Sequence, residues 1–295
     1  MSLGFLLSLA AGFVWSIGNI IDKANASRFI KNPIFLASIS VCYELVVGVI
    51  VIALVPADIH GLDWFWLISS GACYMTATLL YFFAIQREEP SRVVPLYAFT
   101  IVFLSLQSAI FLGEIFSIQT YLGIAMIAIA SLALLVRQNV FDAFRSKAFG
   151  LMIGGTFLYS LSYIINKYLL IHYSYWQVFG YVKLFIGCTG ILFLLFFIKE
   201  LRKTFRRIQK RYIGLSAISE TFNIAGSLLF VAASSVWFVT LVETVVSVQY
   251  IFIFIWGILL ASLFPRFRLE VVNKRIIIQK VLSIAAIIIG IYLIY

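Results

Sequence analysis

The chain has 295 residues, of which 63% are hydrophobic and 12% are charged, against about 25% charged in typical soluble domains. This composition excludes an ordinary soluble fold and indicates a membrane protein. The net charge of +10 does not indicate nucleic-acid binding, because Lys and Arg fall in short gaps between apolar runs and form no basic stripe with interleaved aromatic residues. The cysteines Cys42, Cys73 and Cys188 lie in apolar runs without CxxC spacing, so neither a metal site nor a disulfide framework is expected.

Ten apolar runs follow one another between charged or turn-rich gaps, and each is near the ~20 residues that a helix needs to cross the hydrocarbon layer. They lie at about 3–21, 33–55, 64–85, 93–112, 119–136, 149–171, 176–198, 212–233, 236–262 and 276–295. The sequence therefore predicts an all-α integral membrane protein with ten transmembrane helices. We expect two five-helix repeats, 1–137 and 149–295, joined by a basic linker at 138–148.

A short motif at the end of the first run returns in altered form at the end of the sixth. W-S-I-G-N-I-I-D-K ends at Lys23, and Y-S-L-S-Y-I-I-N-K ends at Lys167. Each copy carries an aromatic residue, a serine, an isoleucine pair and a final lysine in the same register, which indicates an internal duplication. Because each repeat has an odd number of helices, the two repeats are expected to insert in opposite orientations. Inverted repeats of this kind place a substrate path near the membrane midplane, between the halves.

Positive charge alternates along the gaps. The gap after the seventh run holds seven Lys and Arg residues from Lys199 to Arg211, whereas the gap after the second run holds Asp58, His60 and Asp63 and no Lys or Arg. The positive-inside rule puts the basic gaps in the cytoplasm and both termini outside. We expect a multi-pass protein of a prokaryotic plasma membrane, with the Lys199 to Arg211 gap as a solvated loop touching anionic headgroups.

Four charged residues lie at mid-helix depth in the apolar runs, where a charge costs about 2.5–3.5 kcal/mol, so each is a candidate functional residue. Glu44 and Lys183 occupy the second helix of the two repeats and are predicted to form a structural ion pair, in preference to a role in transport. Glu220 and Glu243 are predicted to act in proton coupling or as charge partners of a substrate amine. The alternative for these two is a hydrogen bond that holds neighbouring helices together.

Polar side chains around Glu220 and Glu243 follow helical spacing. The run at 212–233 carries Ser216, Glu220, Asn223 and Ser227, and the run at 236–262 carries Thr240, Glu243, Ser247 and Tyr250. At ~1.5 Å per residue, both glutamates lie about 11–12 Å deep in a layer of about 30 Å. The two polar faces therefore predict a shared site near the midplane.

Aromatic and amide side chains of several helices complete the predicted cavity. The candidate substrate-binding residues are Trp15, Asn19, Tyr74, Thr78, Tyr81, Tyr97, Tyr159, Tyr163, Asn166, Asn223, Ser227 and Tyr250. Such walls suit an organic solute with apolar and hydrogen-bonding parts better than a bare inorganic ion. No catalytic residue, metal ligand or cofactor is expected.

These features resemble the EamA-type permeases of the drug/metabolite transporter superfamily. The likeness rests on the two copies of the motif, Leu79-Leu80-Tyr81, Leu228-Leu229-Phe230, Pro95, and Gly113-Glu114 followed by Ser117, Gln119 and Gly123. The second repeat departs from this pattern, because a longer basic gap, 264–275, stands where an equivalent of Glu114 is expected. The resemblance implies ten helices in two inverted repeats, a central cavity, and export or exchange of metabolites such as amino acids by alternating access.

The sequence thus predicts a secondary transporter, an exporter or exchanger, for a small organic solute such as an amino acid or related metabolite. Its expected partners are that solute and the lipid bilayer. No ATP-binding motif is present, so proton coupling is the candidate drive. A flippase for a lipid-linked sugar and a non-transporting membrane scaffold or receptor remain alternatives. A membrane-embedded enzyme is disfavoured, because the two histidines, His60 and His172, stand without acidic clusters at ligand spacing.

Overall fold

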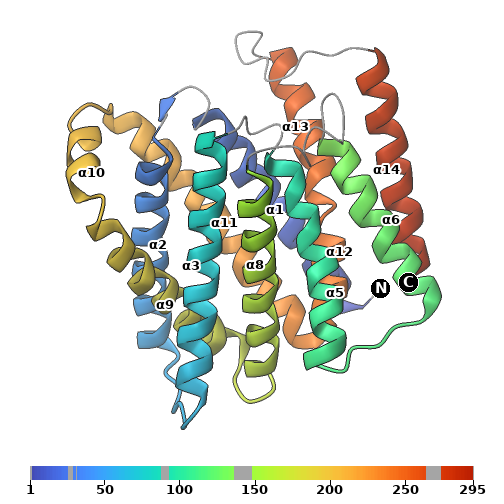
Figure 1. The fold of residues 1–295 in the computed structure, drawn as a ribbon, viewed down its shortest axis with the longest axis horizontal. Coiled ribbons are helices and arrows are strands. Elements are labelled where there is room, and N and C mark those ends of the chain that lie inside the picture. Colours follow the sequence, from blue (N-terminus) through green and yellow to red (C-terminus); the bar gives the residue numbers. More distant parts are fainter. Residues whose placement is uncertain are drawn as a thin grey trace.

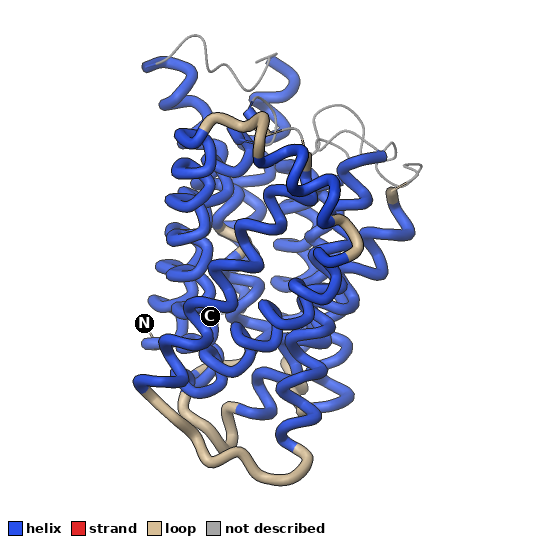
Figure 2. Tube along the Cα trace, turned by 90° about the vertical axis from the view of Figure 1, so that its left-hand side faces the viewer, coloured by secondary structure: helices blue, strands red, loops and turns tan. Residues whose placement is uncertain are grey.

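A computed structural model describes residues 2–25, 29–30, 32–87, 93–135, 148–263 and 274–294. Over these residues the chain forms helices and no strand. The long helices run side by side and are roughly vertical in Figure 1. Most of the described loops gather at the two ends of the bundle (Figure 2). The predicted linker at 138–148 lies outside the described residues except for Ala148, as do residues 264–273 of the last basic gap.

The helices follow the predicted runs closely. In the first half they are α1 (Leu3–Ala24), α2 (Pro33–Leu54), α3 (Asp63–Arg87), the 3-10 helix η2 (Val94–Ala98), α5 (Phe99–Phe111) and α6 (Ile118–Leu135). In the second half they are α8 (Phe149–Leu169), α9 (Tyr175–Leu195), α10 (Ile198–Phe205), α11 (Lys210–Val236), α12 (Val239–Val246), α13 (Gln249–Leu263) and α14 (Lys274–Ile294).

Seven of the described helical segments are long and apolar enough to cross a membrane. Three shorter apolar helices, Leu96–Phe111, Ile118–Ala133 and Ile278–Ile294, occupy the positions of the fourth, fifth and tenth predicted spans. The chain is therefore an all-helical, multi-pass membrane protein.

Polar side chains at the helix starts explain where several of these helices begin. The Asn32 side chain accepts hydrogen bonds from the amides of Ile34 and Phe35, and Pro33 occupies the first turn of α2. Proline fits there because the first amides of a helix have no partner within it. Ser174 and Gln177 form a capping box at the start of α9, in which each side chain bonds the backbone of the other.

Two predicted helices are interrupted. The run at 93–112 begins as the 3-10 helix η2, which contains Pro95, before α5 continues it. The run at 236–262 is divided into α12 and α13 by a turn at Ser247 and Val248, although Val239–Leu259 as a whole is long and apolar enough to cross a membrane. Thr244 Oγ1 donates to Thr240 O and Ser247 Oγ donates to Thr244 O, each at 2.6 Å. Hydroxyls that bond back to helix carbonyls bend helices in this way.

A short helix that the sequence analysis assigned to a loop follows α9. Within the stretch from Lys199 to Arg211, the structure forms α10, visible at the left of Figure 1. The side chain of Asn32 holds α10 against the start of α2. Its Nδ2 donates to Glu200 Oε1 at 2.8 Å and to Thr204 Oγ1 at 3.1 Å. This stretch is largely exposed, as expected for a solvated connection, but part of it is helical, and the apolar residues of α10 recur at helical spacing.

The most extensive helix contacts join the two halves of the chain. They pair α1 with α11, α2 with α9, α3 with α8 and α6 with α14. The helices that contribute buried side chains to the largest apolar cluster are α1, α2, α3, α5, α8, α9, α11 and α12.

The backbones of α2 and α9 approach closely at two glycines. A Cβ atom placed on Gly48 would lie 2.7 Å from Leu184 Cα, and one placed on Gly187 would lie 2.7 Å from Leu45 Cα. Real side chains do not tolerate such distances, so this crossing requires glycine. Gly48 is four residues after Glu44 and Gly187 is four after Lys183. Positions four apart share a helix face, so the crossing turns the two charged residues toward each other.

The close crossing of α2 and α9 predicts opposite effects for two Gly→Ala substitutions. At Gly257 in α13 a Cβ would meet no atom within 4 Å, so Gly257→Ala is expected to leave stability unchanged or raise it by about 0.5–1 kcal/mol. Gly187→Ala should instead destabilise the protein by about 1–3 kcal/mol through overpacking. Thermal unfolding of the purified variants in one detergent compares them, and equal gains at both positions would contradict the crossing.

Candidate functional site

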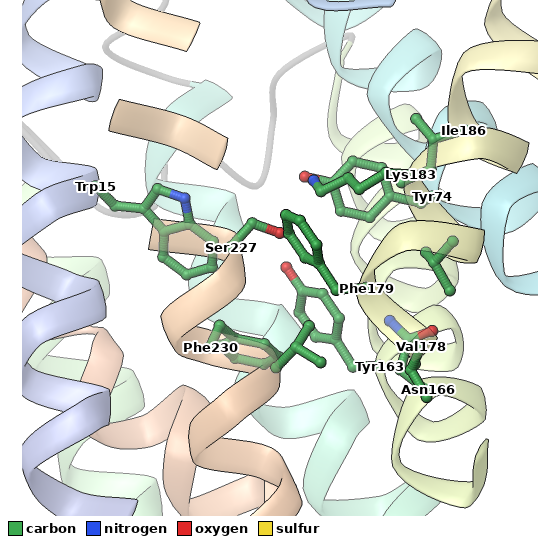
Figure 3. Close-up of a pocket in the computed structure, with 12 residues that line it drawn as sticks. Trp15, Tyr74, Tyr163, Asn166, Val178, Phe179, Lys183, Ile186, Ser227 and Phe230 are labelled. Atoms are coloured by element: carbon green, nitrogen blue, oxygen red, sulfur yellow. The ribbon is translucent and has the colours of Figure 1, made fainter. Parts of the chain in front are cut away.

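A cavity with about 390 Å³ of empty space lies among α1, α3, α8, α9 and α11. Its lining residues are Trp15, Tyr74, Tyr163, Asn166, Val178, Phe179, Val182, Lys183, Ile186, Ser227, Phe230 and Val231. In Figure 3, Trp15 and Phe230 enter from one side, whereas Lys183, Tyr74 and Asn166 enter from the other. Both halves of the chain therefore contribute to one cavity.

A second cavity adjoins the first. It has about 220 Å³ of empty space and shares Tyr74 and Ile186 with the larger one. Its other lining residues are Ala37, Ser40, Val41, Glu44, Met75 and Thr78. The two cavities are thus separated by little more than the shared side chains of α3 and α9.

Helix packing fixes the aromatic walls of the larger cavity. Trp15 Nε1 donates to the backbone oxygen of Asn223 at 2.8 Å, and a Cβ on Gly226 would lie 2.6 Å from the indole. The Trp15 ring can therefore occupy this position only because residue 226 is glycine and has no side chain. The rings of Tyr163 and Phe230 pack with their centroids 4.7 Å apart. Buried aromatic pairs of this kind hold their geometry and leave a rigid apolar wall.

The ion pair between Glu44 and Lys183 lies where the two cavities meet. Lys183 Nζ donates to Glu44 Oε1 at 2.8 Å, and the side chains of Lys183 and Glu44 are only 4% and 8% exposed. The ammonium also stands 5.7 Å from the ring centre of Tyr74 and 5.5 Å from that of Phe179, within the range of a cation–π contact. Glu44 Oε2 is buried and has no hydrogen-bond partner among the described residues. One oxygen of this carboxylate therefore remains unused.

The predicted substrate-binding residues divide into two groups. Trp15, Tyr74, Tyr163, Asn166 and Ser227 line the larger cavity and Thr78 lines the smaller one. The remaining six, Asn19, Tyr81, Tyr97, Tyr159, Asn223 and Tyr250, line neither cavity. Three of the six form an aromatic cluster beside the smaller cavity, in which Tyr159 bonds Thr78 Oγ1 at 2.9 Å and packs on Tyr97 with ring centres 5.8 Å apart.

The other residues of the second group make contacts between helices. Asn19 is exposed and donates to Gln249 Oε1 at 2.9 Å. Tyr250 packs against the apolar cluster formed by α6, α13 and α14. The Asn223 side chain donates to Asp22 Oδ2 at 3.0 Å, while Ser219 Oγ donates to Asp22 Oδ1 at 2.6 Å. Asp22, in the repeated motif of α1, thus anchors α1 to α11.

The two glutamates predicted to share a site differ in their hydrogen bonding. Glu220 Oε2 accepts a hydrogen bond from Ser40 Oγ of α2 at 3.2 Å. Glu243 Oε2 is buried and has no hydrogen-bond partner in the part of the chain that the structure describes. Neither glutamate lines a cavity, and no hydrogen bond between them is described. Helical spacing placed each residue on a polar face but could not show which neighbouring helix that face meets.

Several lining residues were not predicted. Phe179, Phe230 and Ile186 line the larger cavity and Met75 lines the smaller one. An apolar side chain in an apolar helix carries no sequence signal that distinguishes a cavity wall from a lipid-facing surface. The sequence identifies Ser40 and Lys183 as polar residues within apolar helices. It does not place them in a cavity wall, because that position depends on the packing of α2 against α9.

Lys167 and Glu114 hold the connection between α11 and α12. Lys167 Nζ donates to Ser234 O at 2.6 Å and to Trp237 O at 2.9 Å, where α11 ends. Glu114 accepts from the amide of Val239 at 3.4 Å and from Thr240 Oγ1 at 3.3 Å, where α12 begins. A cation at a helix C-terminus and an anion at an N-terminus both suit the helix dipole. Burial raises the pKa of the Glu114 carboxyl above its ordinary value, and the hydrogen bonds from Val239 and Thr240 oppose that shift.

These helices and cavities define a multi-pass helical membrane protein with an internal site between its two halves. Residues 2–136 match the EamA-like transporter family, which the sequence resemblance also indicated.

Two further similarities extend the comparison. The chain is 36% identical over 81 residues to an "Uncharacterized transporter in cobO 3'region" of Sinorhizobium sp., a match that covers 28% of this chain and 57% of that protein. The chain therefore spans only a little over half the length of this curated relative. A solved crystal structure described only as that of a protein superimposes with a TM-score of 0.70 at 13% identity, covering 99% of this chain and 95% of that one. This likeness shows a shared fold.

The position of Lys167 predicts a loss of stability when its charge is removed. Lys167→Met leaves the carbonyls of Ser234 and Trp237 without their donor, so the protein should lose about 1–3 kcal/mol. Lys203→Met provides the matched control, because Lys203 is exposed on α10. Thermal unfolding in detergent should separate the two variants, and equal melting temperatures would contradict a capping role for Lys167.

Proposed function

We propose that this protein is a secondary transporter, an exporter or exchanger, that moves a small organic solute such as an amino acid or related metabolite by alternating access. The observation that carries the proposal is the cavity between the two halves, whose walls combine aromatic rings, amide and hydroxyl groups and a buried charge pair. A membrane site with walls of this polarity suits a solute with apolar and polar parts. The match of residues 2–136 to a transporter family supports the same conclusion.

The helix contacts support two inverted repeats, 1–137 and 149–295, with ten crossings in all. In two such repeats α1 corresponds to α8, and α3 corresponds to α11. The contact between α1 and α11 is therefore equivalent to the contact between α8 and α3. The other two contacts, of α2 with α9 and of α6 with α14, each join a helix to its equivalent in the other repeat. This pattern is expected when a two-fold axis in the membrane plane relates two five-helix repeats.

Alternating access requires that contacts between the halves break at one end of the bundle at a time. At the end near the loop joining α2 and α3, Tyr173 Oη donates to Asp63 Oδ2 at 2.8 Å and Tyr181 Oη donates to Ala57 O at 3.1 Å. At the opposite end, Asn25 Nδ2 donates to Ser216 Oγ at 3.0 Å. These side-chain bonds join the two halves at opposite ends of the bundle, where gates are expected.

Glu243 and Glu220 are the proposed proton-coupling groups. Each is a carboxyl group inside a membrane-crossing helix and can therefore link solute movement to proton movement. Glu220 reaches the cavity wall through Ser40, which lines the smaller cavity. Glu243 has an oxygen for which the described residues supply no partner.

Coupling through Glu243 predicts a specific transport phenotype. In proteoliposomes loaded with a radiolabelled mixture of the twenty common L-amino acids, wild-type counterflow should respond to an imposed pH gradient. Glu243→Gln should abolish that response, because the amide cannot carry a proton at this position. Asp58→Asn removes an exposed carboxylate and should respond as the wild type does. A gradient response in Glu243→Gln equal to that of the wild type would remove Glu243 from the coupling role.

The charge distribution predicts a plasma-membrane protein whose basic gaps face the cytoplasm, with both termini outside. Single cysteines at Asp58 and Lys203, in a variant without Cys42, Cys73 and Cys188, test this orientation. A membrane-impermeant maleimide should label intact cells at position 58 and should label position 203 only after lysis. Labelling of position 203 in intact cells would reverse the proposed orientation.

The same kinds of measurement distinguish the proposed transporter from two other functions. A flippase for a lipid-linked sugar would be stabilised by lipid-linked compounds and not by free solutes. A membrane scaffold or receptor would bind a solute and show no flux above that of empty liposomes.

A further inference from the structure

The Glu44–Lys183 pair is placed for recognition of a ligand. Glu44 lines the smaller cavity and Lys183 lines the larger one, so the pair bridges both. A purely structural pair would be expected to use all of its hydrogen-bonding capacity within the protein. Here Glu44 Oε2 is buried without a partner among the described residues. An unpaired carboxylate oxygen in a cavity wall is a vacant acceptor.

Charge balance limits what can bind there. In a low-dielectric interior, an ion that adds an uncompensated charge to a neutral ion pair is costly. A solute that carries one positive and one negative group adds no net charge and can place each group against its opposite. The ammonium of such a solute would meet Glu44, and its anionic group would meet Lys183.

The surroundings of the pair fit the same arrangement. Ser40 lies in the cavity with Glu44 and donates to Glu220, so acceptor oxygens gather at that end. The larger cavity around Lys183 offers the aromatic rings of Tyr74, Phe179, Tyr163, Trp15 and Phe230. These apolar walls suit the side chain of the solute, while the ion pair takes its charged head.

We propose that Glu44 and Lys183 form the charge-recognition subsite of the transporter, and that its substrates are zwitterions in which an ammonium binds Glu44 Oε2 and a carboxylate binds Lys183 Nζ. This inference rests on the proposed transport function and specifies its substrate class. It assigns to the pair a role in solute binding in addition to its contribution to helix packing.

A series of analogues tests the charge requirement. L-Phenylalanine is zwitterionic, its methyl ester is a cation and N-acetyl-L-phenylalanine is an anion, and all three share the aromatic side chain that the cavity walls suit. Binding to purified protein is measured as ligand-dependent thermal stabilisation, with the other nineteen common L-amino acids in the same screen. We expect at least one amino acid to stabilise the protein and to bind about tenfold or more tightly than its ester and N-acetyl analogues, because each analogue leaves one buried charge without its partner.

The decisive variant is Glu44→Gln/Lys183→Met, which removes both charges together. Single substitutions would leave one buried charge unpaired and could prevent folding, whereas loss of the whole pair is often tolerated. The double variant should fold and lose the preference for the zwitterion over its two analogues. The matched control, Asp58→Asn/Lys203→Met, removes one exposed charge of each sign and should keep the preference.

Three outcomes would overturn the inference. They are an unchanged zwitterion preference in Glu44→Gln/Lys183→Met, equal binding of all three analogues to the wild type, and no stabilisation by any of the twenty amino acids. Counterflow assays with sugars, nucleosides and amino acids separate this failure from failure of the proposed function. Flux of some other solute without the zwitterion preference would overturn only the subsite, whereas no flux of any solute would overturn transport as well.

Discussion

The ion pair between Glu44 and Lys183 is the interaction on which the centre of the bundle depends. Both charged side chains are almost completely buried, so removal of one partner is expected to cost several kcal/mol. The glycines Gly48 and Gly187 let the two helices approach closely enough for the pair to form at 2.8 Å. Because both side chains also line the cavities, the same crossing that joins the halves shapes the site between them.

The bilayer imposes a second constraint, because hydrocarbon offers no partner for a free backbone amide or carbonyl. The break between α12 and α13 lies within the protein, where the hydroxyls of Thr244 and Ser247 bond the helix carbonyls. Where α11 ends, Lys167 supplies the donors, and where α12 begins, Glu114 supplies the acceptors. These side-chain bonds therefore provide partners for polar backbone groups at helix interruptions inside the protein.

Much of this organisation could be predicted from the sequence, since hydropathy locates apolar helices and a charge within them is rare enough to identify Glu44 and Lys183. Six cavity-lining residues, including Trp15, Tyr163 and Thr78, followed from polar and aromatic residues at mid-helix positions. The break at Ser247, the helix α10 and the orientation of Glu220 toward Ser40 could not be predicted, because each depends on which helices become neighbours. Helical periodicity defines a face but does not identify its partner.

The central claim is that a solute crosses the membrane through the cavity between the halves. Counterflow of radiolabelled amino acids into proteoliposomes, with Ser227→Trp compared with Ile218→Trp, tests it most directly. Both residues lie on α11, but Ser227 lines the cavity and Ile218 is 52% exposed on the outer face. Wild type and Ile218→Trp should show flux above that of empty liposomes, and Ser227→Trp should fold normally and show none. Wild-type flux through Ser227→Trp, or none through the wild type, would contradict the account.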